Sequence, residues 1–213
     1  MSLADLRRDY ARARLDEHDV GADPVAQVSR WIDQAVAAAA LEPTAMTLAT
    51  ATADGIPSAR MVLLKALDER GFVFYTHYDS PKGLELDANP RAALVLYWPE
   101  LERQVRVTGV VERVSREETA SYFVSRPFPS RIGAWASRQS TVLPDRATLE
   151  REVAAASARF ADGDVPVPPA WGGYRVRPHV IELWQGGQSR LHDRIRYRQP
   201  ESGEGWIIER LAP

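Results

Sequence analysis

The stretch AMTLATATADGIPSARMVLLKALDERGFVFYTH, residues 45–77, decides the fold. Turn signals at Ala53-Asp54-Gly55 and around Asp68 to Gly71 divide it into three runs of strand-like residues, 45–53, 56–67 and 72–77. Short strands that follow one another with only a tight turn between them pair antiparallel. The stretch therefore predicts a β-meander.

The rest of the chain adds strands and helices around this meander. Further strands are predicted over 91–98, 101–114, 172–185, 190–199 and 205–211. Helices are predicted over 3–18, from the Asp23 cap to before Pro43, and over about 80–90, 115–125, 132–136 and 145–161. Because the strands and helices do not alternate strictly, we expect a mainly β fold with α decoration, a closed or half-closed barrel. Residues 1–20 are expected to form an N-terminal helical arm, and 21–213 a single domain.

The composition of the chain excludes several classes of function. The chain has 213 residues, a formal net charge of −2 and no cysteine. Neither nucleic acid nor membrane is expected as a partner, and no metal site is predicted, because thiolate ligands are absent and the four histidines are scattered. No nucleotide-binding glycine motif or nucleophile elbow occurs. A cytoplasmic location is the expectation.

The segment Arg60 to Lys65, RMVLLK, is an apolar run bracketed by two cations. It is typical of a strand buried on both faces. Arg60 and Lys65 are five residues apart, so they would point to opposite faces of that strand. They are either the solvated ends of a core strand or groups that serve two different anions.

Two clusters resemble phosphate cradles. Tyr75 and Thr76 end a strand and lead through Ser80 to Lys82 at a predicted helix start, where amides and an ammonium favour an anion. Tyr122, Arg126 and Ser130 form the second cluster, with Ser130 placed to cap the next helix. Ordinary helix capping is the alternative for both.

The segment Trp184–Arg194, WQGGQSRLHDR, has Arg190, His192 and Arg194 at alternating positions, so a strand here would carry them on one face together with Arg196 and Arg198. Such a row is either a solvated edge or the wall of an anion site. Gln104, Gln139, Ser140 and Trp184 add neutral partners for a flat heterocycle. Together the clusters suit two stacked, phosphorylated aromatic molecules that exchange electrons.

These segments resemble the pyridoxine/pyridoxamine 5'-phosphate oxidase family. The resemblance rests on RMVLLK (60–65), FYT (74–76), ERQVRV (102–107), YFVSRPFPSRIGAWASRQS (122–140), WGGYRV (171–176), ELWQGG (182–187), RLHDR (190–194) and the closing RLAP. It implies an FMN-binding split β-barrel that forms a homodimer, with FMN between the subunits.

The resemblance also implies a role for individual residues. FMN would be bound by Arg60, Met61, Val62, Leu63, Leu64, Lys65, Tyr75, Thr76, Lys82, Gln104, Gln139, Ser140, Trp184 and Arg194. The substrate would be bound by Lys65, Tyr122, Arg126, Ser130, Arg190, Leu191 and His192, and by Arg7 and Tyr10 of the N-terminal segment. Arg190 and His192 would be the catalytic residues at the pyridine ring.

The implied reaction converts pyridoxine 5'-phosphate or pyridoxamine 5'-phosphate to pyridoxal 5'-phosphate, with hydride transfer to the flavin and reduction of O2 to H2O2. The alternatives are a flavin oxidase of the same fold acting on another aromatic substrate, such as a phenazine precursor, and a non-catalytic carrier of flavin or pyridoxal phosphate. The chain departs from the family pattern at Pro81, where a basic residue is frequent, and over ARARLDEHDV after Tyr10.

Overall fold

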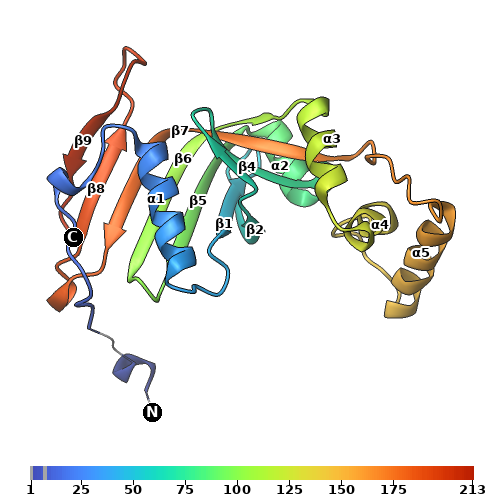
Figure 1. Cartoon of the computed structure of the whole chain (residues 1–213), viewed down its shortest axis with the longest axis horizontal. Helices are drawn as coiled ribbons and strands as arrows, with labels where there is room; N and C mark the ends of the chain where they lie inside the picture. The colour runs from blue at the N-terminus through green and yellow to red at the C-terminus, as the bar shows by residue number, and fades with distance from the viewer. Residues whose placement is uncertain (1, 7–8) are drawn as a thin grey trace.

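The computed structural model describes residues 2–6 and 9–213, and a single antiparallel sheet dominates it (Figure 1). Its strands are β1 (Ala45–Ala51), β2 (Pro57–Leu63), β3 (Ala66–Asp68), β4 (Gly71–His77), β5 (Arg91–Trp98), β6 (Arg103–Arg113), β7 (Trp171–Gln185), β8 (Asp193–Arg198) and β9 (Ile207–Arg210). The helices are α1 (Pro24–Ala37), α2 (Pro81–Ala88), α3 (Arg116–Ser125), α4 (Phe128–Ala136) and α5 (Arg146–Arg159), with short 3-10 turns η1 (Leu3–Asp5), η2 (Glu17–Asp19) and η3 (Gln188–Arg190). The mainly β fold with inserted helices is confirmed.

The sheet order is β2-β1-β5-β6-β7-β4-β3, with β8 beside β7 and β9 beside β8. The long strand β7 pairs with β6, and in addition its first residues pair with β4 and its last residues with β8. Because one strand serves different neighbours at its two ends, the sheet coils into a half-barrel instead of staying flat. The predicted meander is wrong: β1 and β2 form one hairpin and β3 and β4 another, and the two hairpins lie at opposite ends of the strand order, because β2 pairs with β1 whereas β4 pairs with β7.

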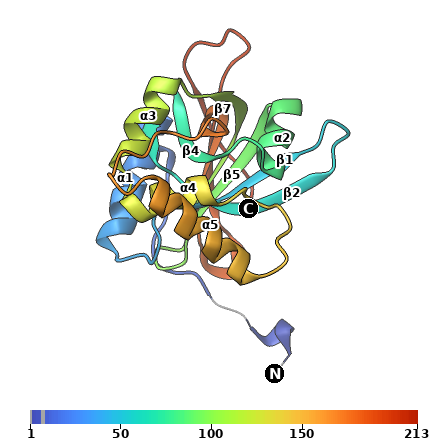
Figure 2. The same ribbon diagram turned by 90° about the vertical axis from the view of Figure 1, so that its right-hand side faces the viewer.

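Two hydrophobic cores hold the fold together. In the main core, Val28 and Trp31 of α1 pack on alternate side chains of the sheet such as Leu48, Leu94 and Val107. A second core joins α3, α4 and α5 around Phe123, Ile132, Phe160 and Trp171. In Figure 2 these helices face the viewer at one end of the molecule. The second core fixes them to the first residue of β7.

The N-terminal segment differs from the predicted helical arm. In the described part of this segment, Leu3–Asp5 and Glu17–Asp19 form short 3-10 turns, and residues 9–16 form neither helix nor strand. The backbone N–H groups of Ala11 and Leu15 donate to the carboxylates of Glu102 and Asp193, which are distant along the chain. The many charged residues of this segment thus mislead a helix prediction, because the partners of its backbone lie elsewhere in the sequence. Arg7, a predicted substrate residue, lies outside the described residues.

The predicted strand 56–67 is divided into β2 and β3 between Leu63 and Ala66. We expected this strand to be buried on both faces, but β2 is an edge strand of the sheet and Met61 is 62% exposed. An apolar run in the sequence gave no means of telling a central strand from an edge strand.

The helix after Arg126 is longer than predicted. It begins at Phe128 behind Pro127, so Ser130 lies in its first turn and is not its cap. Pro129 is tolerated in the first turn of this helix, because the first backbone N–H groups of a helix have no partner within it. In the preceding helix the predicted cap is present, with Ser115 accepting the N–H of Glu118 at 3.0 Å. No helix within the described residues has the length and apolar character that a membrane crossing requires.

The second core gives a stability prediction. Phe123 is fully buried, so Phe123→Ala should lower the free energy of unfolding by about 3–5 kcal/mol. The neighbouring Val124 is 67% exposed, and Val124→Ala should change it by only about 0.5 kcal/mol. Thermal or urea denaturation measures both. Equal effects of the two variants would contradict the assignment of Phe123 to this core.

Candidate functional site

A cavity of about 650 Å³ opens where β2, β4 and α2 meet the second core. Among the predicted FMN and substrate residues it is lined by Arg60, Met61, Val62, Leu63, Lys65, Tyr75, Thr76, Lys82, Tyr122, Arg126, Ser130, Gln139 and Ser140. Arg60 and Lys65 line the same cavity and do not serve opposite faces. The reason is that β2 ends at Leu63, so strand alternation no longer applies at Lys65. The Leu64 side chain instead lies in the main core.

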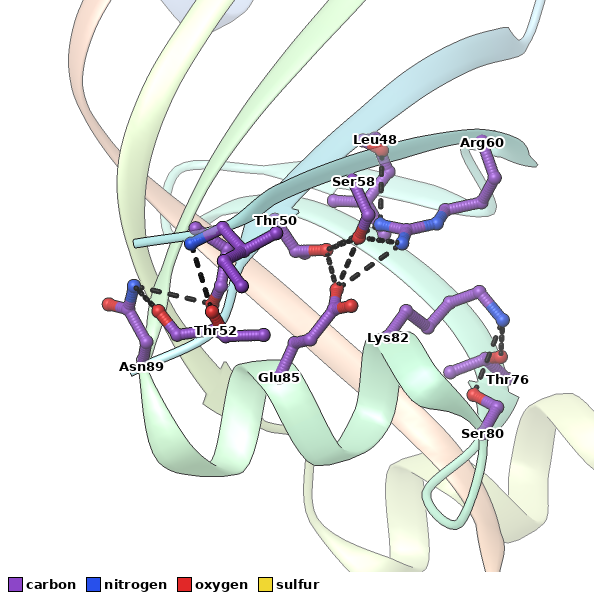
Figure 3. A network of polar contacts seen from close by, with 12 residues as sticks. Leu48, Thr50, Thr52, Ser58, Arg60, Thr76, Ser80, Lys82, Glu85 and Asn89 are labelled. Carbon is purple, nitrogen blue, oxygen red and sulfur yellow. Dashed lines mark hydrogen bonds and ion pairs between the residues drawn. The ribbon is translucent and has the colours of Figure 1, made fainter. Parts of the chain in front are cut away.

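The ammonium group of Lys82 is the centre of a candidate phosphate-binding site (Figure 3). Its ammonium donates to Gln139 Oε1 at 2.8 Å, Ser80 Oγ at 3.2 Å and Thr76 Oγ1 at 3.3 Å, all neutral oxygens. Lys82 is only 8% exposed, and burial, reinforced by the nearby Arg60, lowers its pKa. A bound phosphate would offset both effects, so this donor set fits the phosphate of a mononucleotide.

Arg60 is held by a network that ties α2 to β1 and β2 (Figure 3). Its guanidinium donates to Thr50 and Ser58 and lies 3.3 Å from Glu85 Oε2. Glu85 in turn accepts hydrogen bonds from Thr50 and Ser58. Burial alone would raise the pKa of Glu85, but these hydrogen bonds and Arg60 outweigh it and lower the pKa. The network fixes Arg60 and positions α2, and with it Lys82.

Arg126 is the unsatisfied group of the cavity. Its guanidinium lies 4.7 Å from the ring centroid of Trp171, and burial lowers its pKa. Its Nη1 atom is buried and finds no hydrogen-bond partner among the described residues. An unpaired buried cation is costly, whereas an anion beside it is strongly favoured. Arg126 therefore marks a second anion position in the same cavity.

Aromatic rings form one wall of the cavity. Tyr75 and Tyr122 stack with centroids 4.0 Å apart and planes at 20°, and Trp171 lies parallel to both. Burial raises the pKa of the Tyr75 hydroxyl to about 12, with a smaller contribution from Glu118, so this hydroxyl stays protonated at neutral pH. The wall suits a flat organic ligand.

The remaining predicted residues lie in a second cluster at the other end of β7. Trp184 and His192 have ring centroids 4.6 Å apart, and Tyr10 contacts both at 5.7 and 5.8 Å. Gln104 and Arg194 are the cross-strand neighbours of Trp184 on β6 and β8. Leu191, together with Ala11, Ala13 and Arg14, lines an adjoining hollow of about 680 Å³.

The predicted row of cations on one strand face is wrong at Arg190 and His192. The strand begins only at Asp193, and Arg190 lies in the preceding turn with a left-handed φ of 63°. On the strand itself the cations are neutralised by carboxylates. Arg194 forms two hydrogen bonds to Glu182, at 2.8 and 3.1 Å, and Arg196 and Arg198 share Glu209. Glutamates from neighbouring strands thus relieve the repulsion that the sequence suggested.

The two clusters are separated by the length of β7. Trp171 is its first residue and lines the cavity, whereas Trp184 is its last but one and belongs to the second cluster. Thirteen residues of strand span roughly 40 Å. One small ligand cannot touch both clusters of the same chain.

Sequence reasoning missed several residues of the site. His77 and Trp171 line the cavity, and Glu85 and Glu182 hold Arg60 and Arg194 in place. Trp171 lies in the quoted motif WGGYRV, and His77 follows FYT directly, so the motifs could have included both. Glu182 is the first residue of the quoted motif ELWQGG and could have been included in the same way, whereas no quoted motif contains Glu85, whose partner Arg60 is distant along the chain.

Comparison with known proteins decides the family. A family model described as pyridoxamine 5'-phosphate oxidase matches residues 32–160. A second, described as the pyridoxine 5'-phosphate oxidase C-terminal dimerisation region, matches residues 171–213. The chain belongs to the pyridoxamine 5'-phosphate oxidase family. It is 59% identical over 213 residues to a pyridoxine/pyridoxamine 5'-phosphate oxidase from Burkholderia multivorans (100% of this chain, 99% of the relative), and 58% identical over 212 residues to one from Ralstonia pickettii, at the same coverage.

Solved structures confirm the split-barrel fold. PhzG from Burkholderia lata 383, crystallised with tetrahydrophenazine-1-carboxylic acid, matches with a TM-score of 0.87 and 35% identity over 93% of this chain and 98% of its own. An FMN-binding protein from Nostoc punctiforme has the same fold, with a TM-score of 0.71 and 15% identity over 91% of this chain and 100% of its own. As a member of the pyridoxamine 5'-phosphate oxidase family, the protein is an oxidoreductase with FMN as its cofactor, and residues 171–213 provide its dimerisation region.

The network around Glu85 predicts a pH dependence of stability. Its folded-state pKa is lowered, so its stabilisation is complete above the unfolded value of about 4.3 and is lost as pH falls through the lower folded value. Glu85→Gln removes the charge. The difference in urea midpoint between the wild type and this variant, both saturated with FMN, should be constant near neutral pH and shrink below roughly pH 4. A difference that grows on acidification would contradict this account.

Proposed function

We propose that the protein oxidises pyridoxine 5'-phosphate and pyridoxamine 5'-phosphate to pyridoxal 5'-phosphate. The alcohol loses two hydrogens, and the amine in addition takes up water and releases ammonia, while O2 becomes H2O2. The buried Nη1 of Arg126 carries this proposal, because it has no hydrogen-bond partner in the described ranges and lines the same cavity as Lys65, Tyr122 and Ser130. A substrate phosphate would satisfy it.

FMN supplies, when bound, the two-electron acceptor that links substrate oxidation to O2. We assign its phosphate to Lys82 and Thr76, with Gln139 and Ser140 beside them and Arg60 of β2 in the lining of the same cavity. The hydrogen bonds of Lys82 to Thr76, Ser80 and Gln139 go to neutral oxygen atoms, so none of these three partners competes with a phosphate as a counter-ion. This arrangement supports the assignment despite Pro81, which leaves the cradle without the basic residue that is frequent there.

We infer further that each complete site uses two copies of the chain. The cavity of one copy holds the phosphates, and the cluster of Trp184, Arg190, His192 and Arg194 comes from its partner. The separation of these clusters along β7 supports this arrangement, as does the match of residues 171–213 to a dimerisation region. Two-fold symmetry then gives two equivalent sites per homodimer.

His192 is suited to act as a neutral hydrogen-bond donor at the substrate ring. Burial lowers its pKa, and Arg190 and Arg194 lower it further, so the imidazole is uncharged at neutral pH. Its Nδ1 accepts the N–H of Gly187 at 3.2 Å. The proton of the neutral ring is therefore held at Nε2, which is left to face the substrate.

A second candidate function is oxidation of an unphosphorylated aromatic acid. The likeness to PhzG, at 35% identity and a TM-score of 0.87, favours it. Such a substrate would leave Arg126 without a phosphate, which is why we place it second. A third possibility is a non-catalytic carrier of flavin or pyridoxal phosphate, and repeated turnover of any substrate in the assay below would exclude it.

One assay separates these functions. Purified protein should be yellow and should release peroxide on addition of pyridoxine 5'-phosphate or pyridoxamine 5'-phosphate, but not of their unphosphorylated forms. Peroxide formation with a phenazine precursor alone would favour the second candidate. A protein that stays inactive with added FMN would contradict all oxidase assignments.

Arg126→Ala should raise KM for the phosphorylated substrate about ten- to a hundredfold, the loss expected for one charge-assisted hydrogen bond. Steady-state peroxide formation measures it. Arg146→Ala is the matched control, because Arg146 is exposed on α5 and pairs only with Glu150 in the same helix. An unchanged KM in Arg126→Ala would remove this residue from the phosphate site.

Arg190→Ala should slow the reduction of bound flavin by substrate while FMN remains bound. The reason is that Arg190 is assigned to the substrate ring and not to the FMN phosphate. Stopped-flow measurement of flavin bleaching under anaerobic conditions tests this. Bleaching at the wild-type rate would show that Arg190 has no role in the reductive step.

A further inference from the structure

Glu102 fastens the N-terminal segment to the second cluster. Its Oε2 accepts the backbone N–H groups of Ala11 and Arg12, both at 3.0 Å. The residue is only 4% exposed, although it lies in the loop before β6. Hydrogen bonds from two N–H groups to one buried carboxylate are stronger than bonds between neutral groups. The contact is therefore a built anchor and not a chance surface contact.

The backbone of Glu102 is itself fixed. Its φ of 56° lies in the left-handed region, which a residue with a side chain adopts only where the surroundings enforce it. Its carbonyl oxygen accepts the N–H of Gly186 at 2.8 Å and the side-chain amide of Gln185 at 3.3 Å. These bonds fix the backbone of Glu102, and with it the carboxylate, beside the end of β7, where Gly186 follows Trp184 by two residues.

Tyr10, the residue before the anchored amides, lies directly on this strand end. A Cβ atom added at Gly186 would come within 2.7 Å of Tyr10 Cγ and 3.1 Å of Glu102 Cβ. Glycine at this position lets the ring approach the backbone closely enough to contact Trp184 edge-on, with planes at 88°. The first glycine of the motif WQGG is thereby explained by a residue far away in the sequence.

We propose that Glu102 is a positioning residue for the reaction: by binding the amides of Ala11 and Arg12, it holds the Tyr10 ring against Trp184 and His192. This inference rests on the proposed function, which places His192 at the substrate ring. Fixing the segment in advance removes the cost of ordering it when substrate binds. Asp193 gives the same segment a second anchor by accepting the N–H of Leu15 at 3.0 Å.

Glu102→Ala should raise KM for the phosphorylated substrate about tenfold, with a smaller change in kcat. The FMN-loaded dimer is the sample. Glu102→Gln should recover much of the loss, because its amide oxygen still accepts the two N–H groups. Glu112→Ala is the matched control, since Glu112 lies on β6, the strand that follows Glu102, and pairs with Arg177 instead of the N-terminal segment. It should leave KM unchanged.

A double variant tests whether Glu102 acts through Tyr10. If it does, adding Glu102→Ala to Tyr10→Ala should change KM little beyond Tyr10→Ala alone, because the two residues share one function. Fully multiplicative effects would overturn the proposal. Gly186→Ala provides an independent route, since its methyl group displaces the Tyr10 ring and should reproduce the KM increase while Glu102 is intact.

Hydrogen exchange separates this inference from the proposed function. The amides of Ala11 and Arg12 should be protected in the wild-type holoenzyme, exposed in Glu102→Ala and largely protected in Glu102→Gln. Unprotected amides in the wild type would overturn the positioning role. A wild-type enzyme without activity on either phosphorylated vitamer would instead overturn the proposed function, while the exchange result would still show whether Glu102 holds the segment.

Discussion

The length of β7 is the constraint on which the rest of the structure depends. Its first residue, Trp171, forms part of the second hydrophobic core and of the cavity wall, and its last residues support the cluster around His192. A continuous strand of 15 residues keeps these two groups apart. If, as we propose, both groups belong to one catalytic site, a single chain cannot complete it, and the proposed reaction requires the dimer.

The cationic side chains of the protein differ in whether a carboxylate neutralises them. Several arginines are paired with carboxylates: Arg60 with Glu85, Arg194 with Glu182, and the fully buried Arg175 with Asp68 and Glu118. Lys82 and Arg126, which line the cavity together with Arg60, instead have neutral or aromatic neighbours. A chain with a net charge of −2 can in this way hold two local positions for anions.

The sequence predicted the parts of the molecule that depend on local signals. Turn residues marked the turns of the β1–β2 and β3–β4 hairpins, and caps such as Asp23 and Ser115 marked the starts of helices. The failures concern distant partners. The position of β2 is set by its pairing with β1. The course of the N-terminal segment is set by its hydrogen bond to Glu102, and the turn at Arg190 is set by the close approach of Gly187 to the backbone of Leu191. Strand alternation therefore placed Arg190 and Lys65 on the wrong side. The motif resemblance does not depend on side-chain direction, and many of the residues that it named line the cavity, but the ligand that each of them binds stays a prediction.

Subunit complementation tests the shared site most directly. Arg126→Ala disables the cavity half and Arg190→Ala the His192 half, so a mixed dimer of the two variants contains one doubly altered site and one intact site. After random reassortment, about one quarter of all sites should be intact. Peroxide formation at low substrate concentration should then recover to about that fraction of the wild-type rate, well above the rate of either variant alone. A mixture that shows only the average of the two variants would contradict a site built from two chains.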